Sequence, residues 1–245
     1  MQIIDYNELV RRSRCFRKRL VTAMMSATGP RHDVIQVMQT AIWCAEVSNR
    51  FAGRSWYHIE RKLEPDAFGK SADGFAYHRN KWNAYHVGAH KPHCTLVAQV
   101  DQRLPGTERL LNHVLWEAIR GKKTSAQLWS QGIGQLAPEI QKILASLCSR
   151  QITNLRQAKI GRRFLKQLEV RAGPDSLACL IILLRKAVDD GRQELALEIG
   201  TSIYYVALMM CAHLPYCNFT DEFFYLLNQF VFPLAKDEQQ SIWLD

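Results

Sequence analysis

Three histidines and a cysteine lie within nine residues of one another, at His86, His90, His93 and Cys94. On one continuous helix His86 and His90 would share a face, and that spacing can hold zinc. Gly88 interrupts such a helix, however, and structural zinc sites usually take four ligands, often from CxxC pairs that this chain lacks. We therefore expect no metal. We interpret the histidines as surface groups beside phosphates, able to gain charge as the pH falls.

Motifs of the common enzyme classes are missing from the sequence. It contains no GxGxxG, GxxxxGK, HExxH or GxSxG pattern. Its acidic residues are scattered rather than paired in the way that two-metal catalysis requires. We therefore expect no enzyme of a common class and no cofactor, which leaves open an enzyme of an unusual class.

The most specific pattern in the chain lies between His78 and Gly106. Trp82 and Tyr85 are three residues apart, so on a helix they would share one face. Gly88 can adopt the left-handed conformation that often ends a helix. A second helix is predicted after Pro92, because apolar residues recur there at helical spacing: Val97, Val100 and Leu104.

About residues 75–104, this pattern resembles the phage-repressor-type helix-turn-helix. That family ends its recognition helix with an aromatic residue, a polar residue, any residue and Gly, and Pro follows four residues later. Tyr85 to Gly88 and Pro92 match in order. In the family another helix comes first. Here the corresponding segment, Asp66 to Ala76, contains Gly69 and Gly74, which helices disfavour.

The resemblance implies a recognition helix from His78 to Tyr85 in the major groove, anchored from behind by Trp82 and Tyr85. Arg and Lys hydrogen-bond guanine in that groove, and Asn hydrogen-bonds adenine. The side chains implied to face DNA are Arg79, Asn80, Lys81 and Asn83.

The same segment also resembles helical HEPN-type ribonucleases. These have an Arg, a polar residue and then a His four to six residues further along, as Arg79, Asn80 and His86 do here. The resemblance implies a base for the ribose 2′-hydroxyl and a cation for the scissile phosphate, usually acting across a dimer.

The charge of the chain favours an anionic partner. Its 32 Lys and Arg residues outnumber its 23 acids, for a formal charge of +9. Two segments, Asp5 to Ala27 and residues 150–171, concentrate basic residues with few acids. We expect them to hold backbone phosphates, which position a protein without specifying a sequence. The residues singled out are Arg12, Arg14 and Lys18 in the first segment and Arg162 and Arg163 in the second.

Cysteine usage and hydropathy bear on the compartment. The seven cysteines include no CxxC pair, and their odd number argues against a complete disulfide framework. Reduced thiols indicate the cytoplasm. No apolar run approaches the roughly 18 to 20 residues that span a membrane, so we expect no membrane partner.

Apolar residues recur at helical spacing along the chain, and no segment shows sustained alternation, so we predict an all-α helical bundle with an embedded helix-turn-helix-like segment. One helix is predicted from Thr107 through Ile119. The polar linker Gly121 to Ser125 suggests two domains, residues 1–121 and 122–245. The second, with its apolar helices, is expected to form a scaffold or an oligomerisation module.

These expectations combine into one main hypothesis and two alternatives. The main hypothesis is an intracellular, bacterial or phage-like regulator that binds nucleic acid, duplex DNA in preference to RNA. The first alternative is a helical protein-interaction subunit of a larger assembly that contains nucleic acid. The second is a HEPN-like ribonuclease.

Overall fold

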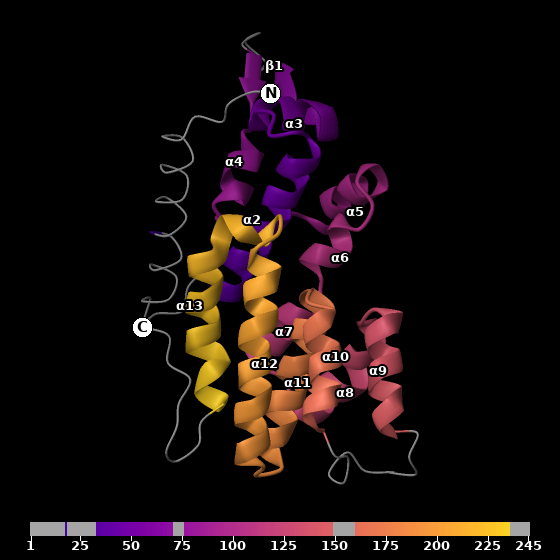
Figure 1. The fold of residues 1–245 in the computed structure, drawn as a ribbon. Coiled ribbons are helices and arrows are strands. Elements are labelled where there is room, and N and C mark those ends of the chain that lie inside the picture. Colours follow the sequence, from indigo (N-terminus) through magenta and orange to yellow (C-terminus); the bar gives the residue numbers. More distant parts are fainter. Residues whose placement is uncertain (1–17, 19–32, 71–75, 149–159, 236–245) are drawn as a thin grey trace. The chain divides into compact units, whose positions relative to one another are not determined.

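A computed structural model of the chain describes residues 18, 33–70, 76–148 and 160–235 (Figure 1). Helices dominate these residues, and one two-stranded antiparallel sheet is the only sheet among them. The predicted all-α fold is therefore confirmed. The chain divides into two compact units, residues 1–112 and 113–245.

The first unit contains five helices among the described residues, together with a short 3-10 turn and the two strands. In chain order they are α2 (Val34–Arg50), α3 (Trp56–Leu63), η1 (Pro65–Ala67), β1 (Phe68–Lys70), β2 (Ala76–His78), α4 (Lys81–His86), α5 (Cys94–Arg103) and α6 (Thr107–Leu111).

The described part of the second unit is built from helices and short 3-10 turns. In chain order they are α7 (Val114–Arg120), α8 (Ser125–Gly132), η2 (Ile133–Gln135), α9 (Pro138–Cys148), α10 (Arg162–Val170), α11 (Pro174–Asp189), α12 (Gln193–Cys211), η4 (Tyr216–Phe219), α13 (Thr220–Phe230) and η5 (Phe232–Leu234).

Local capping explains where the first helices of unit 1 begin. The Asp33 carboxylate accepts a hydrogen bond from the Ile35 amide at 3.0 Å, and the Ser55 hydroxyl accepts one from the His58 amide at 3.4 Å. Both satisfy an amide that the helix itself leaves without an acceptor. α2 then packs against α4 and α6, and α3 packs against α4.

The segment before α4 is a β-hairpin, where the helix-turn-helix family has a helix. Phe68 pairs with His78 and Lys70 with Ala76 in antiparallel register. The rings of Phe68 and His78 stack across the strands with centroids 4.6 Å apart, a cross-strand contact that stabilises such a pair. Gly69, which disfavours a helix, lies in β1, and Gly74 falls outside the described residues. The helix that comes before the recognition helix in that family is therefore replaced by paired strands in the described residues.

The prediction of a single helix from Thr107 to Ile119 is wrong, because the helix ends at Leu111 and Asn112 is its C-cap. His113 begins a new helix, α7: its Nδ1 accepts from the Leu115 amide at 3.1 Å, and its Nε2 lies 3.3 Å from Asp175 on α11. α7 therefore packs in the second unit. The units divide after Asn112 rather than at the predicted boundary after Gly121.

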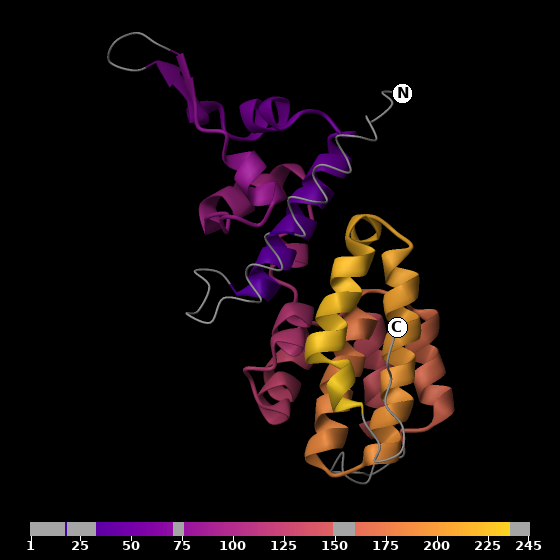
Figure 2. The same ribbon diagram turned by 90° about the vertical axis from the view of Figure 1, so that its left-hand side faces the viewer.

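In the second unit α11 is buried almost all round and packs against α7, α8 and α12, with α11 and α12 side by side in both views (Figures 1 and 2). Among the described residues, only α12 is long and apolar enough to cross a membrane, which the sequence analysis did not foresee. However, 56% of that stretch is buried inside the structure. The core helix of a bundle has the same properties.

Candidate nucleic-acid interface

The candidate interface is built on α4, which is held against α2 and α3 by aromatic side chains. Trp82 is fully buried and stacks on Trp43 and Trp56, with ring centroids 5.5 and 6.4 Å away. Tyr85 lies edge-on to Trp82 at 5.9 Å, and burial raises the pKa of its hydroxyl to about 12. The prediction that these two aromatics anchor the helix from behind is confirmed as far as their burial goes.

Gly88 ends α4 in the left-handed conformation, with φ +65°, as predicted. A Cβ at this position would lie 2.6 Å from the backbone oxygen of Val37 on α2. Glycine is therefore required here both for its conformation and for the close approach of the two backbones. This contact fixes the end of α4 on α2.

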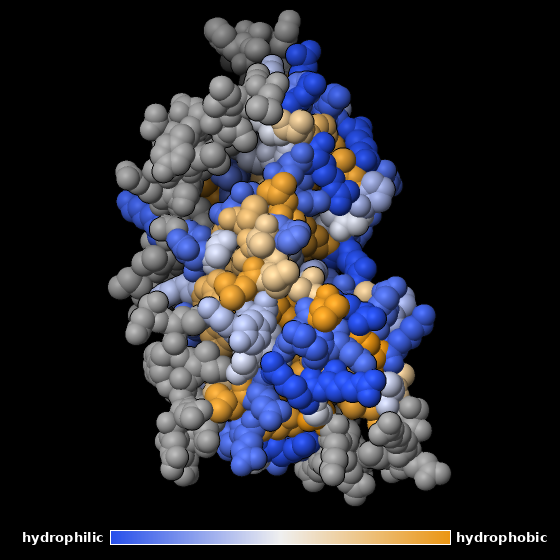
Figure 3. Space-filling view, in the orientation of Figure 1, coloured by the Kyte–Doolittle hydropathy of each residue, from blue (hydrophilic) through white to orange (hydrophobic). Residues whose placement is uncertain are grey.

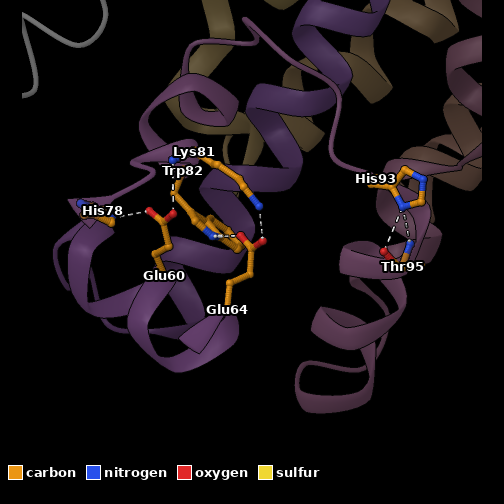
Figure 4. A network of polar contacts seen from close by, with 7 residues as sticks. All are labelled: Glu60, Glu64, His78, Lys81, Trp82, His93 and Thr95. Atoms are coloured by element: carbon orange, nitrogen blue, oxygen red, sulfur yellow. Dashed lines mark hydrogen bonds and ion pairs between the residues drawn. The ribbon is translucent and has the colours of Figure 1, made fainter. Parts of the chain in front are cut away.

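The two carboxylates between α3 and α4 are directed inward (Figure 4). Glu60 is fully buried. It contacts the Nε2 of His78 at 2.8 Å and accepts from the Lys81 amide at 3.3 Å. Glu64 accepts from the Lys81 ammonium at 2.8 Å and from the Trp82 indole at 3.0 Å. Buried charge requires such partners, and both negative charges are satisfied within the unit.

The four residues implied to face DNA do not behave alike. Arg79, Asn80 and Asn83 are exposed, whereas Lys81 is half-buried and paired with Glu64. The helix also begins three residues later than predicted, at Lys81, because His78 is still paired in β2. Asn80 precedes it in the left-handed conformation, with φ +49°. Arg79, Asn80 and Asn83 therefore form the accessible part of the predicted set.

A basic surface around α3 was not predicted from the sequence. Arg54, Arg61 and Lys62 are exposed around His58. Desolvation, together with the charges of Arg54, Lys62 and Arg61, lowers the pKa of His58, and the Nη1 of Arg54 lies 2.9 Å from its Nε2. In Figure 3 the surface over α3 and α5 is largely hydrophilic. The helical spacing of Arg54, His58 and Arg61 or Lys62 was the available signal.

An exposed aromatic residue joins this surface to the hairpin. Tyr57 of α3 is 50% exposed, and its ring lies edge-on to Phe68 at 5.1 Å and to His78 at 5.3 Å. Arg79 directly follows His78 in the chain. We call the set Arg54, Tyr57, Arg61, Lys62, Arg79, Asn80 and Asn83 the α3–α4 face.

The histidine cluster does not gather around a common point. The ring of His86 packs 5.0 Å from that of Trp56, and both its nitrogens are buried. His93 caps α5, with its Nδ1 accepting from the Thr95 amide at 3.4 Å (Figure 4). Cys94, the next residue, is exposed. Among the residues that the structure describes, no three His, Cys, Asp or Glu side chains are placed to hold a metal ion.

The buried nitrogens of His86 also bear on the ribonuclease interpretation. A general base must come within about 3 Å of the proton that it removes. A ribose hydroxyl has no access to a ring nitrogen that solvent does not reach. This geometry gives the ribonuclease interpretation no support.

The other residues predicted to contact phosphates are not part of the α3–α4 face. Arg12 and Arg14 fall outside the described residues, and Lys18 is an exposed helical residue. Arg162 and Arg163 are exposed in the first turn of α10, in the second unit.

Beneath the exposed side of α10, the carboxylate of Glu169 is buried. It accepts from the Ser202 hydroxyl at 2.8 Å and the Lys166 ammonium at 3.1 Å, with Arg162 at 3.6 Å. Desolvation alone would raise the pKa of Glu169. The Ser202 and Lys166 hydrogen bonds and the Arg162 charge outweigh it and lower that pKa. The charge of Glu169 therefore partly offsets the charges of Arg162 and Lys166.

Comparisons of this chain with models of protein families, with curated protein sequences and with solved structures found no match.

Proposed function

We propose that the first unit binds nucleic acid, with duplex DNA as its target, through the α3–α4 face. The observation that carries this proposal is the separation of charge on that surface. Four cations, Arg54, Arg61, Lys62 and Arg79, are exposed, while the neighbouring acids Glu60 and Glu64 are directed inward. Asp66 is the exposed acid on the adjoining turn.

The exposed cations supply the affinity in this proposal. Each Lys or Arg that neutralises a phosphate releases condensed counterions, so binding weakens steeply as salt rises. Arg54 precedes α3, and Arg61 and Lys62 lie in its last turn, so cations stand at both ends of this helix, where they can contact separate phosphates of a backbone. The exposed ring of Tyr57 adds an apolar surface between the two groups of cations.

The polar residues around the start of α4 supply the specificity. Arg79 can donate two hydrogen bonds to guanine, and Asn80 and Asn83 can bind adenine in the same way. The buried Trp82 and Tyr85 and the contact of Gly88 with Val37 keep α4 rigid, and a rigid element orients such contacts at lower entropic cost.

The proposal is tested by titrating fluorescent 20-base-pair duplexes and a single-stranded RNA with the full chain at two salt concentrations. The triple variant Arg54→Ala/Arg61→Ala/Lys62→Ala should bind more weakly, and its salt slope should fall by about one unit for each lost phosphate contact. Equal affinity at both salt concentrations would contradict the proposal.

Asn83 tests the specific part of the interface. Asn83→Ala should weaken binding to the preferred duplex by about 1 to 3 kcal/mol, the discrimination typical of a bidentate base contact. Gln99→Ala is the matched control, because Gln99 is an exposed amide on α5 outside the α3–α4 face. Cleavage of the RNA that disappears with His86→Ala alone would favour the ribonuclease instead.

A second candidate function, a protein-interaction subunit, has its own observation in the second unit. Tyr205, Leu208 and Met209 lie at helical spacing on α12 and are 48%, 41% and 56% exposed. Contiguous exposed apolar side chains are typical of protein contact sites. Met209→Glu should convert a concentration-dependent oligomer into a monomer in light scattering. If the unsubstituted protein is already a monomer at all concentrations tested, self-association through these three residues is contradicted.

A further inference from the structure

A cavity of about 280 Å³ lies beside the turn between α7 and α8, in the second unit. The turn residues, Gly121 to Ser125, form one wall. Arg185, Val188 and Asp189 of α11 form another, and Leu234 completes the lining. This turn is the segment predicted to be a polar linker between domains, and in the structure Gly121 approaches Arg185 closely.

Arg185 is held in this cavity by the end of α7. Its Nε donates to the carbonyl oxygen of Ala118 at 2.8 Å, and its Nη2 donates to that of Ile119 at 3.1 Å. These carbonyls lie in the last turn of the helix, where acceptors lack intrahelical donors. Nη1 makes no hydrogen bond with the described residues.

The turn is shaped around the guanidinium group. Gly121 has φ +67°, and a Cβ there would lie 2.6 Å from Nη2 and 2.8 Å from Nη1 of Arg185. Any other residue would push the guanidinium away or strain the backbone. Burial lowers the pKa of Arg185 and the charge of Asp189 opposes that shift. Arginine nonetheless remains protonated in proteins.

The lining of the cavity carries a net positive charge. Lys122, Lys123 and Arg185 contribute three cations and Asp189 one carboxylate, so the formal sum is 3 − 1 = +2. Glu117 lies nearby, 3.9 Å from the Lys123 ammonium, but its closer contact is with Arg120. A fixed guanidinium beside two lysines is the donor set that proteins use for phosphate groups.

We propose that this cavity binds the phosphate or diphosphate group of a small ligand. Its volume is at the small end for ligand pockets, which suits a compact anion. The Arg185 guanidinium supplies a fixed donor, and Lys122 and Lys123 supply charge from the turn. The cavity is partly open to solvent, so a small anion can enter it from solution.

The test is isothermal titration calorimetry of the full chain with inorganic pyrophosphate and, separately, with ATP and with inorganic triphosphate. The parent protein should bind pyrophosphate, and Lys122→Ala/Lys123→Ala should weaken it roughly 10- to 100-fold, since hydrogen bonds to charged groups are the strong ones. Lys142→Ala, an exposed lysine on α9, is the control and should leave the affinity unchanged. Tighter binding of ATP than of inorganic triphosphate, which carries the same number of phosphates, would identify the ligand as a nucleotide.

Arg185→Lys keeps the positive charge and removes the planar guanidinium donors, so it should also weaken pyrophosphate binding. Circular dichroism checks that each variant is folded. The proposal is overturned by no binding at millimolar pyrophosphate, or by binding that the lysine double variant does not change. It is also overturned if a short DNA duplex displaces pyrophosphate with the same dependence on Lys122 and Lys123, because the site would then belong to backbone phosphates.

Discussion

Trp82→Ala is the substitution that most directly tests how the α3–α4 face is held together. Trp82 is fully buried, contacts Trp43, Trp56 and Tyr85, and donates its indole N–H to Glu64. A buried aromatic of this size removes about 150 to 250 Å² from water, worth about 4 to 6 kcal/mol at 25 cal/mol per Å². Measured aromatic-to-alanine losses are about 3 to 5 kcal/mol. Both estimates are a large share of the stability of a small unit.

Hydrogen exchange followed by mass spectrometry is the suitable assay, because a chain with two units need not unfold in one step. A loss of 3 to 5 kcal/mol should speed exchange of the slowest amides in α2 to α5 by roughly 10²- to 10⁴-fold. Amides of the second unit should be unaffected. Trp82→Phe keeps an aromatic ring and loses the bond to Glu64, so its effect should be smaller.

Trp116→Ala is the reciprocal control, since Trp116 is buried in the second unit against Phe223. It should speed exchange there and leave α2 to α5 protected. Two results would refute the claim that Trp82 is the central packing residue of the first unit. One is that Trp82→Ala lowers the free energy of opening of that unit by less than about 1 kcal/mol. The other is that it lowers this free energy equally in both units.

Three further outcomes are expected. Gly88→Ala should destabilise the first unit by more than about 1 kcal/mol in denaturant titrations, because its φ is positive and the new Cβ would meet Val37; unchanged stability would contradict the contact. The pKa of Glu169 is lowered on folding, so the unfolded state binds more protons in acid. Its contribution to stability is present above the ordinary value of 4.5 and lost as the pH falls below it, and Glu169→Gln should flatten acid melting of α10 and α12 in hydrogen exchange. Burial raises the pKa of Cys211 to about 12 and Cys217 is exposed, so peptide mapping after iodoacetamide at pH 8 should find Cys217 modified and Cys211 protected; the reverse order would be inconsistent with their burial.

Part of this structure could be predicted from the sequence because its causes are local. The cap residues Asp33 and Ser55 begin helices where their side chains reach the next amides along the chain. Trp82 and Tyr85 are buried because a spacing of three places both on one face of a helix, whichever surface then covers that face. Periodicity and capping depend on neighbours within a few residues.

Where helices end was predictable only in part. Gly88 closes α4 as predicted, but the break at Asn112 was missed. His113 is bonded both to its own helix and to Asp175, which lies 62 residues further along the chain. The periodic pattern of apolar residues continues across that break, so it carries no sign of a partner so distant in sequence. For the same reason α7 was assigned to the wrong unit.

The character of the candidate sites was decided by the tertiary structure. Glu60 and Glu64 appear in the sequence as acids that offset the basic residues around them. Only the packing of α3 against the hairpin and α4 directs them to His78, Lys81 and Trp82 and leaves the α3–α4 face positive. Arg185 likewise lies in a strongly apolar helix, and only its approach to the end of α7 places it against Gly121. A sequence specifies which charges a chain has, whereas long-range contacts determine which of them are neutralised inside and which remain to meet a ligand.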